Sequence, residues 1–85
     1  WVTARIDDSD VAVEVPLVDV SPTGLRLIVG EPIDEGTILV IDVLPGMALH
    51  AVARWSRDDE GDFLLGAEWQ SPIDPDLVWK IRGPR

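Results

Sequence analysis

The feature that most constrains the fold of this chain is a series of short runs in which apolar and polar residues alternate. Turn signals separate these runs at short intervals. One face of the segment over residues 47–57 carries an apolar residue at every second position: Leu49, Ala51, Ala53 and Trp55. The other face carries His50, Val52 and Arg54. A period of two is that of a β-strand with one buried face. We therefore predict a strand here, with Trp55 in the core.

Five further segments have the same character, and turn signals separate them. The predicted strands cover residues 2–6, 11–19, 25–30, 37–44 and 63–69, and the last of these ends on Trp69, which we also place in the core. The turns between strands are expected at Asp7–Asp10, Ser21–Gly24, Glu31–Gly36, Pro45–Gly46 and Asp58–Asp62. Pro16 lacks a backbone N–H, so we expect a sheet edge or a bulge there. Six short strands predict an all-β fold, a six-stranded antiparallel β-barrel.

The last segment of the chain has a helical pattern. Asp74 is a candidate N-cap with Pro75 at the first helical position, and a short apolar stripe follows: Leu77, Val78 and Ile81. We predict a helix over about residues 74–82, ended by Gly83-Pro84, with Trp79 docking it on the barrel. The whole chain is then a single domain over residues 1–85, with its barrel over about residues 2–70.

Composition and charge exclude several classes of protein. The 85 residues contain no cysteine and carry a formal net charge of −9, the wrong sign for a protein that grips long nucleic acid. No stretch approaches the ~20 apolar residues of a membrane span, and no signal-peptide pattern opens the chain. We expect a cytoplasmic domain without membrane insertion. A compact dianion is still an acceptable ligand, because a few placed arginines can hold it locally.

The sequence contains no recognisable group of residues for catalysis or metal binding. His50 is the only histidine, without cysteine or a partnered serine, so neither a triad nor a metal cluster is predicted. The acidic turns lack the spacing of a twelve-residue calcium loop. We expect no enzyme, no metal and no cofactor.

One motif resembles a known family. The residues Val-Asp-Val-Ser-Pro-Thr-Gly-Leu-Arg-Leu at 18–27 resemble the Asp/Asn-x-Ser-x-x-Gly signature of the PilZ domain family. The resemblance continues through later segments of the chain: Gly36–Val40, Val52–Trp55 and Leu65–Trp69. Read alone, an Asp and a Ser two apart, followed by a Gly able to take positive φ, also form a self-bonded strand connection.

The resemblance implies a receptor for the bacterial second messenger cyclic di-GMP. Asp19, Ser21 and Gly24 would then contact a guanine on the barrel surface, through a carboxylate that accepts from guanine N–H groups, a hydroxyl and an approachable backbone. Arg5 and Arg26 are further candidates for this site, and Arg54 is another source of positive charge. The alternative for each arginine is a surface position with its stem along the apolar barrel.

The sequence departs from the family in one respect. The family also has an Arg-x-x-x-Arg pair before its first strand, whereas no two arginines here are four apart: they stand at 5, 26, 54, 57, 82 and 85, and position 9 is Ser9. Either the arginine pair lies upstream of Trp1, or the domain is degenerate and binds no nucleotide. We expect Trp1 itself to be exposed, at an open end of the barrel. For the 85 residues alone we expect weak binding or none.

Two functions therefore stay open. In the first, cyclic di-GMP bridges the motif to an N-terminal arginine arm and changes the surface shown to a partner. In the second, the barrel is a protein-interaction module for an unidentified protein partner or fused domain. An enzyme or an oligonucleotide-binding barrel fits least, because neither a nucleophile-base pair nor a basic stacking groove is visible.

Overall fold

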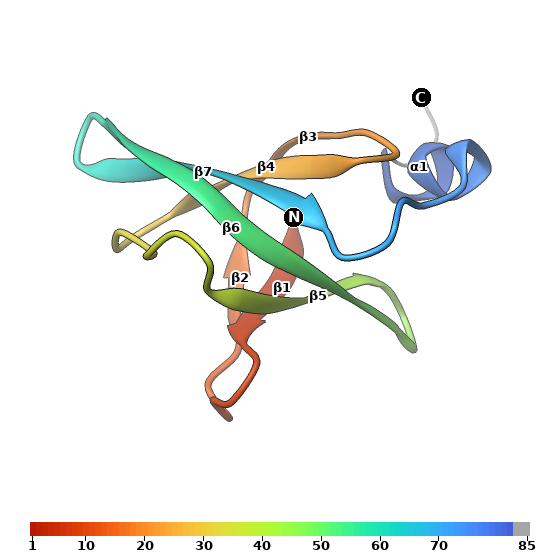
Figure 1. Ribbon diagram of the computed structural model, residues 1–85, viewed down its shortest axis with the longest axis horizontal. Coiled ribbons are helices and arrows are strands. Elements are labelled where there is room, and N and C mark those ends of the chain that lie inside the picture. Colours follow the sequence, from red (N-terminus) through yellow and green to blue (C-terminus); the bar gives the residue numbers. More distant parts are fainter. Residues whose placement is uncertain (83–85) are drawn as a thin grey trace.

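The computed structural model describes residues 1–82, which form seven β-strands and one helix (Figure 1). The strands are β1 (Val2–Ile6), β2 (Val13–Val15), β3 (Leu17–Val20), β4 (Gly24–Val29), β5 (Ile38–Leu44), β6 (Met47–Asp59) and β7 (Asp62–Trp69). They pair antiparallel in the order β2-β1-β5-β6-β7-β4-β3. The all-β prediction, with antiparallel strands and a C-terminal helix, is confirmed.

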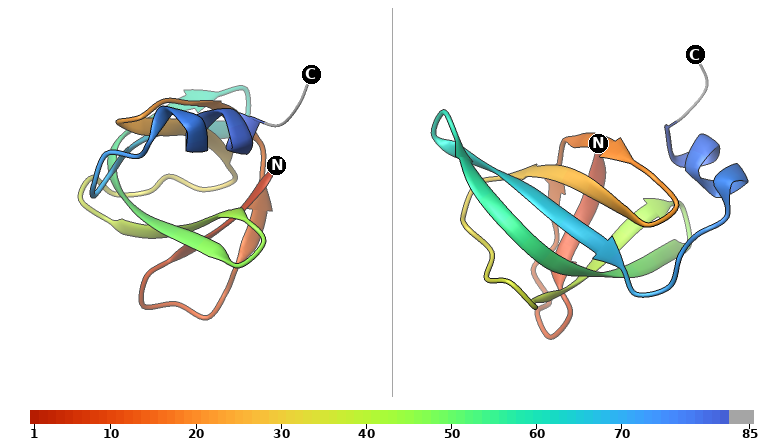
Figure 2. Two further views of the ribbon diagram at one scale, coloured as in Figure 1. Left: turned by 90° about the vertical axis from the view of Figure 1, so that its right-hand side faces the viewer. Right: turned by 45° about the horizontal axis from the view of Figure 1, so that its top comes forward.

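The prediction of six strands was wrong by one, because the run over residues 11–19 is two strands. β2 pairs with β1 and β3 pairs with β4, so the chain changes its partner strand at Pro16. Pro16 has no N–H to give to a ladder, but its carbonyl accepts from the Ile28 amide at 3.1 Å. The two end strands of the sheet are thus joined at this corner, which curves the sheet into a nearly closed barrel (Figure 2).

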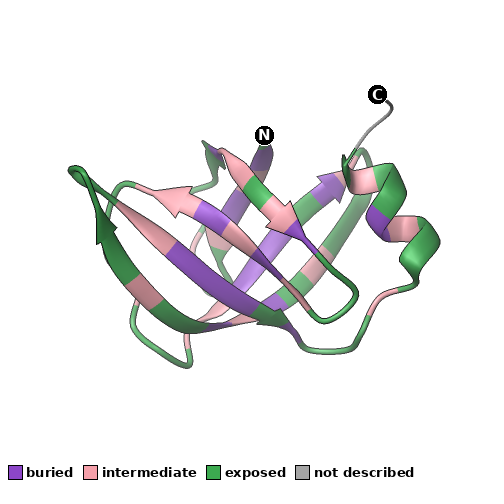
Figure 3. Cartoon of the chain, turned by 90° about the horizontal axis from the view of Figure 1, so that it is seen from above, coloured by how far each residue is buried: buried purple, intermediate pink, exposed green. Residues whose placement is uncertain are grey.

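The hydrophobic core lies inside the curved sheet. Leu27, Ile41 and Leu65 are fully buried, and they come from three different strands. Buried and more exposed residues alternate along β1 and β4, whereas β5 and β7 each have three consecutive buried residues, at 39–41 and 65–67 (Figure 3). Burying a Leu or Ile side chain of this kind contributes about 1.5–3 kcal/mol. Trp69 is buried as predicted.

Trp55 is 41% exposed, so its predicted place in the core was wrong. The alternation holds through Ala51 and Ala53, which are fully buried. The pairing with β7 then shifts, since Ala53 opposes Ala67 and Trp55 opposes Gly66. Such a β-bulge places one extra residue on β6 and reverses the face on which later side chains point.

The loop between β6 and β7 is shorter than the predicted Asp58–Asp62. β6 continues to Asp59 and β7 begins at Asp62, where the two residues pair. Only Glu60 and Gly61 form the turn, with φ of 52° and 95°. Two consecutive positive φ angles are those of a type I′ turn, whose twist matches the flanking strands.

The helix α1 (Pro75–Arg82) begins where the capping pattern predicts. The Asp74 carboxylate accepts the Asp76 amide at 2.8 Å, and Val78 is buried against the barrel. Trp79 is 66% exposed, so its predicted docking role was wrong. At about 100° per residue it points away from the apolar stripe. The predicted stop at Gly83-Pro84 lies outside the described residues.

Within residues 1–82, no helix has the length and apolar character that crossing a membrane requires.

Candidate functional site

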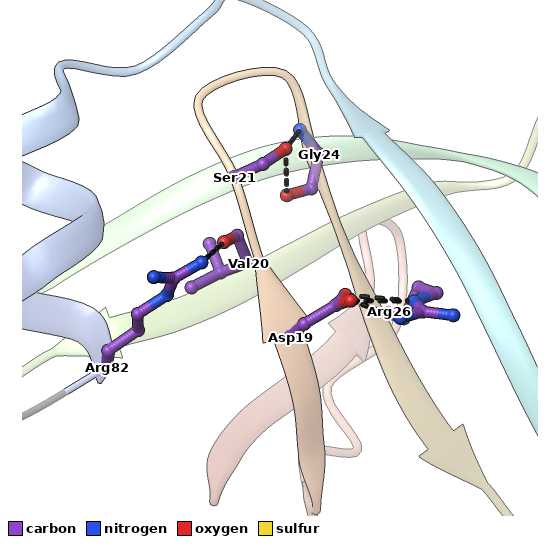
Figure 4. Close-up of polar contacts among 6 residues, drawn as sticks. All are labelled: Asp19, Val20, Ser21, Gly24, Arg26 and Arg82. Carbon is purple, nitrogen blue, oxygen red and sulfur yellow. Dashed lines mark hydrogen bonds and ion pairs between the residues drawn. The ribbon is translucent and has the colours of Figure 1, made fainter.

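The motif residues lie together where β3 turns into β4 (Figure 4). Asp19 is near the end of β3, Ser21 is in the turn, and Gly24 opens β4. The Ser21 amide donates to the Gly24 carbonyl at 2.8 Å, which closes the turn. The Trp69 indole donates to the Ser21 carbonyl at 3.0 Å, which ties the turn to the end of β7. These two hydrogen bonds hold the β3–β4 turn in one conformation.

The Ser21 hydroxyl makes local hydrogen bonds within this turn. It accepts from the amides of Thr23 and Gly24, both at 3.3 Å, and donates to the Gly24 carbonyl at 3.4 Å. The self-bonded strand connection that the motif allows is thus present. These distances are longer than the roughly 2.9–3.0 Å usual for an N–H···O bond and the roughly 2.7–2.8 Å usual for an O–H···O bond, so a ligand can compete for the hydroxyl.

Gly24 is needed for close packing and not for a left-handed conformation. The positive-φ glycines among the described residues are Gly36, Gly46 and Gly61. A Cβ at Gly24 would come within 2.4 Å of the Ala67 carbonyl oxygen on β7. The positive φ that a glycine allows is not used at this position, and the role of Gly24 is the close approach of β4 to β7.

Asp19 and Arg26 form an ion pair across β3 and β4. The Arg26 Nε lies 3.0 Å from one carboxylate oxygen of Asp19 and 2.9 Å from the other, and Nη2 also donates to the carboxylate. This hydrogen bonding lowers the pKa of Asp19 from its ordinary value, although partial burial opposes the shift. The same pair raises the pKa of Arg26. Asp19 is therefore an ionised acceptor at neutral pH.

A pocket of about 430 Å³ opens around the motif. Its lining includes all three motif residues and three arginines, Arg26, Arg54 and Arg82, which come from β4, β6 and α1. Arg54 pairs with Glu68 at 3.1 Å. Arg82 donates to the Val20 carbonyl at 3.0 Å, between Asp19 and Ser21 (Figure 4). Three guanidinium groups against two carboxylates give the pocket a positive balance.

Trp55 supplies an exposed aromatic wall to the same pocket. Its indole lies against Gly66, where a Cβ would come within 2.2 Å of the ring. The Arg57 guanidinium is 5.3 Å from the ring centroid, a cation–π distance. Strand alternation predicts Trp55 inside the barrel, and no residue pattern indicates the bulge that turns it outwards.

The structure separates the remaining predicted site residue from the others. Arg5 lies on β1, and its Nη1 donates to the carbonyls of Asp7 at 2.9 Å and Ser9 at 3.3 Å. It lines a different groove from the one that holds Asp19. Arg82, which the sequence did not single out, takes a place in the pocket because α1 folds back on β3.

Other polar clusters give no competing centre in the described part of the chain. The His50 Nε2 lies 3.5 Å from an oxygen of Asp7 across neighbouring segments. Among residues 1–82, no three His, Asp or Glu side chains gather as a metal-binding group.

The comparisons agree with the motif. A family model described as the PilZ domain matches residues 1–82. No curated protein and no solved structure matches the chain.

Proposed function

The chain belongs to the PilZ domain family, and we propose that it binds cyclic di-GMP in the pocket around Asp19, Ser21 and Gly24. PilZ domains are known as a cyclic di-GMP-binding family and are not a catalytic family. Binding would act as a signal by changing the surface shown to a partner.

The positive balance of the pocket is the observation that carries this proposal. The whole chain has a formal net charge of −9, yet three of its six arginines line this one pocket. A dianionic ligand is repelled by most of the surface and attracted here, where guanidinium groups can form charge-assisted hydrogen bonds to phosphate oxygens. The pocket volume also lies within the range of small-molecule sites.

The motif residues suit the guanine end of such a ligand. A carboxylate offers about four lone-pair positions, so Asp19 can accept from a guanine while it keeps part of its contact with Arg26. The Ser21 hydroxyl is exposed and held only by long hydrogen bonds. A base can stack on the exposed ring of Trp55 if it takes the place of the Arg57 guanidinium that lies over the ring.

A second candidate function is docking to a protein without nucleotide. Two observations favour it: no two arginines among the 85 residues are four apart, and the Asp19 carboxylate and the Ser21 hydroxyl already accept hydrogen bonds within the chain. In that case the motif serves the stability of the β3–β4 corner.

Calorimetric titration with cyclic di-GMP distinguishes the two functions. The proposal predicts saturable binding that Asp19→Ala weakens by about tenfold or more, since a charge-assisted contact to the base is lost. Arg82→Gln should weaken it several-fold through loss of positive charge. Asp58→Ala, an exposed aspartate outside the pocket, is the matched control and should leave the affinity unchanged. Absence of binding both by this chain and by a version extended upstream of Trp1 would favour the docking function.

A further inference from the structure

The barrel has an open seam between β2 and the end of β4. The Pro16 carbonyl and the Ile28 amide close one end of this seam at 3.1 Å. Beyond that bond, no ladder joins β2 to β4 among residues 1–82. A groove of about 650 Å³, which we call the seam groove, lies along this gap. Its floor reaches the buried core at Leu27 and Leu65.

Exposed apolar side chains gather on the rim of the seam groove. Four large apolar residues on the rim are exposed: Trp1, Ile6, Val11 and Val13, at 77%, 40%, 71% and 57%. A concentration of this kind on a small domain is typical of a binding surface. β2 also presents an unpaired strand edge on this side, which another extended chain can use for pairing.

The rim of the seam groove carries acidic side chains that no basic side chain neutralises within residues 1–82. Glu14, Glu31 and Asp62 line the seam groove, and within residues 1–82 none of them takes part in an ion pair. The single basic residue in the lining, Arg5, already donates to the carbonyls of Asp7 and Ser9. The groove thus combines an apolar floor with a negative edge.

We propose that the seam groove binds an extended basic segment of a partner protein, in which apolar residues alternate with Lys or Arg. Apolar side chains would enter the groove, and the basic ones would reach Glu14, Glu31 and Asp62. A second copy of this chain is a poor occupant, because its net charge of −9 would meet the same acidic rim. An anionic lipid is disfavoured for the same reason. This binding is independent of the nucleotide pocket.

Titration with a synthetic peptide of alternating Leu and Lys, followed by amide NMR shifts, tests this proposal. We expect saturable binding, with shifts centred on the seam groove. A peptide of alternating Ser and Lys has the same charge and should bind at least about tenfold more weakly, because it cannot fill the apolar floor.

Variants locate the interaction. Val11→Ser with Val13→Ser should weaken binding, whereas Val18→Ser, an exposed valine of β3 outside the groove, should not. Each of Glu14→Gln and Asp62→Asn should weaken it about two- to fivefold. The proposal would be overturned if the Ser–Lys peptide bound equally well, or if the NMR shifts lay elsewhere on the barrel. It would also be overturned if a fatty acid bound more tightly than the peptide, or if sedimentation showed a dimer that the double variant Val11→Ser with Val13→Ser dissociates.

Discussion

The ion pair of Asp19 and Arg26 sets the electrostatics of the candidate site at the scale of single residues. Both side chains are about half exposed, at 45% and 44%, so solvent screens the pair and its contribution to stability is small. Its value lies in orientation, because Nε and Nη2 of Arg26 both donate to the carboxylate and hold it in place. A ligand would therefore meet an ionised, fixed acceptor.

Replacing Arg26 should release the pKa of Asp19. The Arg26 hydrogen bond is the main cause of the lowered pKa, so Arg26→Gln should return it most of the way to the ordinary value. A carboxylate with a lowered pKa in the folded state stabilises the fold above its unfolded pKa, and loses this contribution as the pH falls through the lowered value. The variant should thus be slightly less stable at neutral pH, with the difference vanishing in acid.

NMR titration of the Asp19 carboxyl carbon measures this shift directly. Lys80→Gln, which removes a positive charge from α1 without touching the pair, is the control and should leave the Asp19 titration in place. An unchanged Asp19 pKa in Arg26→Gln would contradict the assignment of the shift to this hydrogen bond.

At the scale of strands and helices, close contacts and caps explain positions that alternation cannot. The alternation of apolar residues was sufficient to predict most strands and the buried Trp69. It failed at Trp55, because a bulge depends on how two strands pair and not on the residues of one strand. It also merged β2 with β3, since both halves are β-rich and only pairing reveals the change of partner at Pro16.

Gly24→Ala should destabilise the barrel by about 1–3 kcal/mol, because the new Cβ meets the Ala67 backbone, which cannot move aside cheaply. Gly30→Ala is the matched control: nothing lies within 4 Å of its Cβ position and its φ is not positive. That change should be neutral or stabilise by up to about 1 kcal/mol. Urea unfolding of both variants provides the comparison, and equal stabilities would show that β4 does not need its glycine for packing.

The helix cap gives an independent prediction. Asp74→Ala should cost about 1 kcal/mol, since the Asp76 amide loses its acceptor. For a domain of this size the melting temperature should fall by about 4–8 °C. Asp74→Asn keeps an acceptor and should stay close to the original melting temperature. A loss of equal size in Asn would mean that charge, and not the cap bond, stabilises the start of α1.

At the scale of the whole molecule, the separation of charge is the central feature. The net charge is a count of residues in the sequence. The barrel was predictable from the two-residue period of apolar residues, and the three motif residues from a local signature. The sequence could not predict that Arg54 and Arg82 would join Arg26 around the pocket, since they come from elements far apart in the chain. It grouped Arg5 with the site, whereas the fold places that side chain at the β1–β2 turn.

The overall negative charge should make the fold sensitive to salt. The sixteen acidic residues outnumber the seven basic ones, so repulsion among the acidic residues dominates. Salt screens this repulsion. Moderate sodium chloride should therefore raise the melting temperature by a few degrees relative to low salt, measured by circular dichroism. A melting temperature that falls with salt would show that attractive ion pairs outweigh the repulsion.

Calorimetric titration of the same protein with cyclic di-GMP and with cyclic di-AMP tests whether Asp19 recognises guanine. Both carry two phosphates, but only guanine presents two adjacent donors, N1–H and the N2 amino group, to the ionised Asp19 carboxylate. Adenine places a single amino group beside an acceptor nitrogen, which a carboxylate repels. We expect cyclic di-GMP to bind at least about tenfold more tightly than cyclic di-AMP, and Asp19→Ala to abolish this preference. Equal affinities for the two nucleotides, or a preference that survives in Asp19→Ala, would contradict recognition of guanine by Asp19.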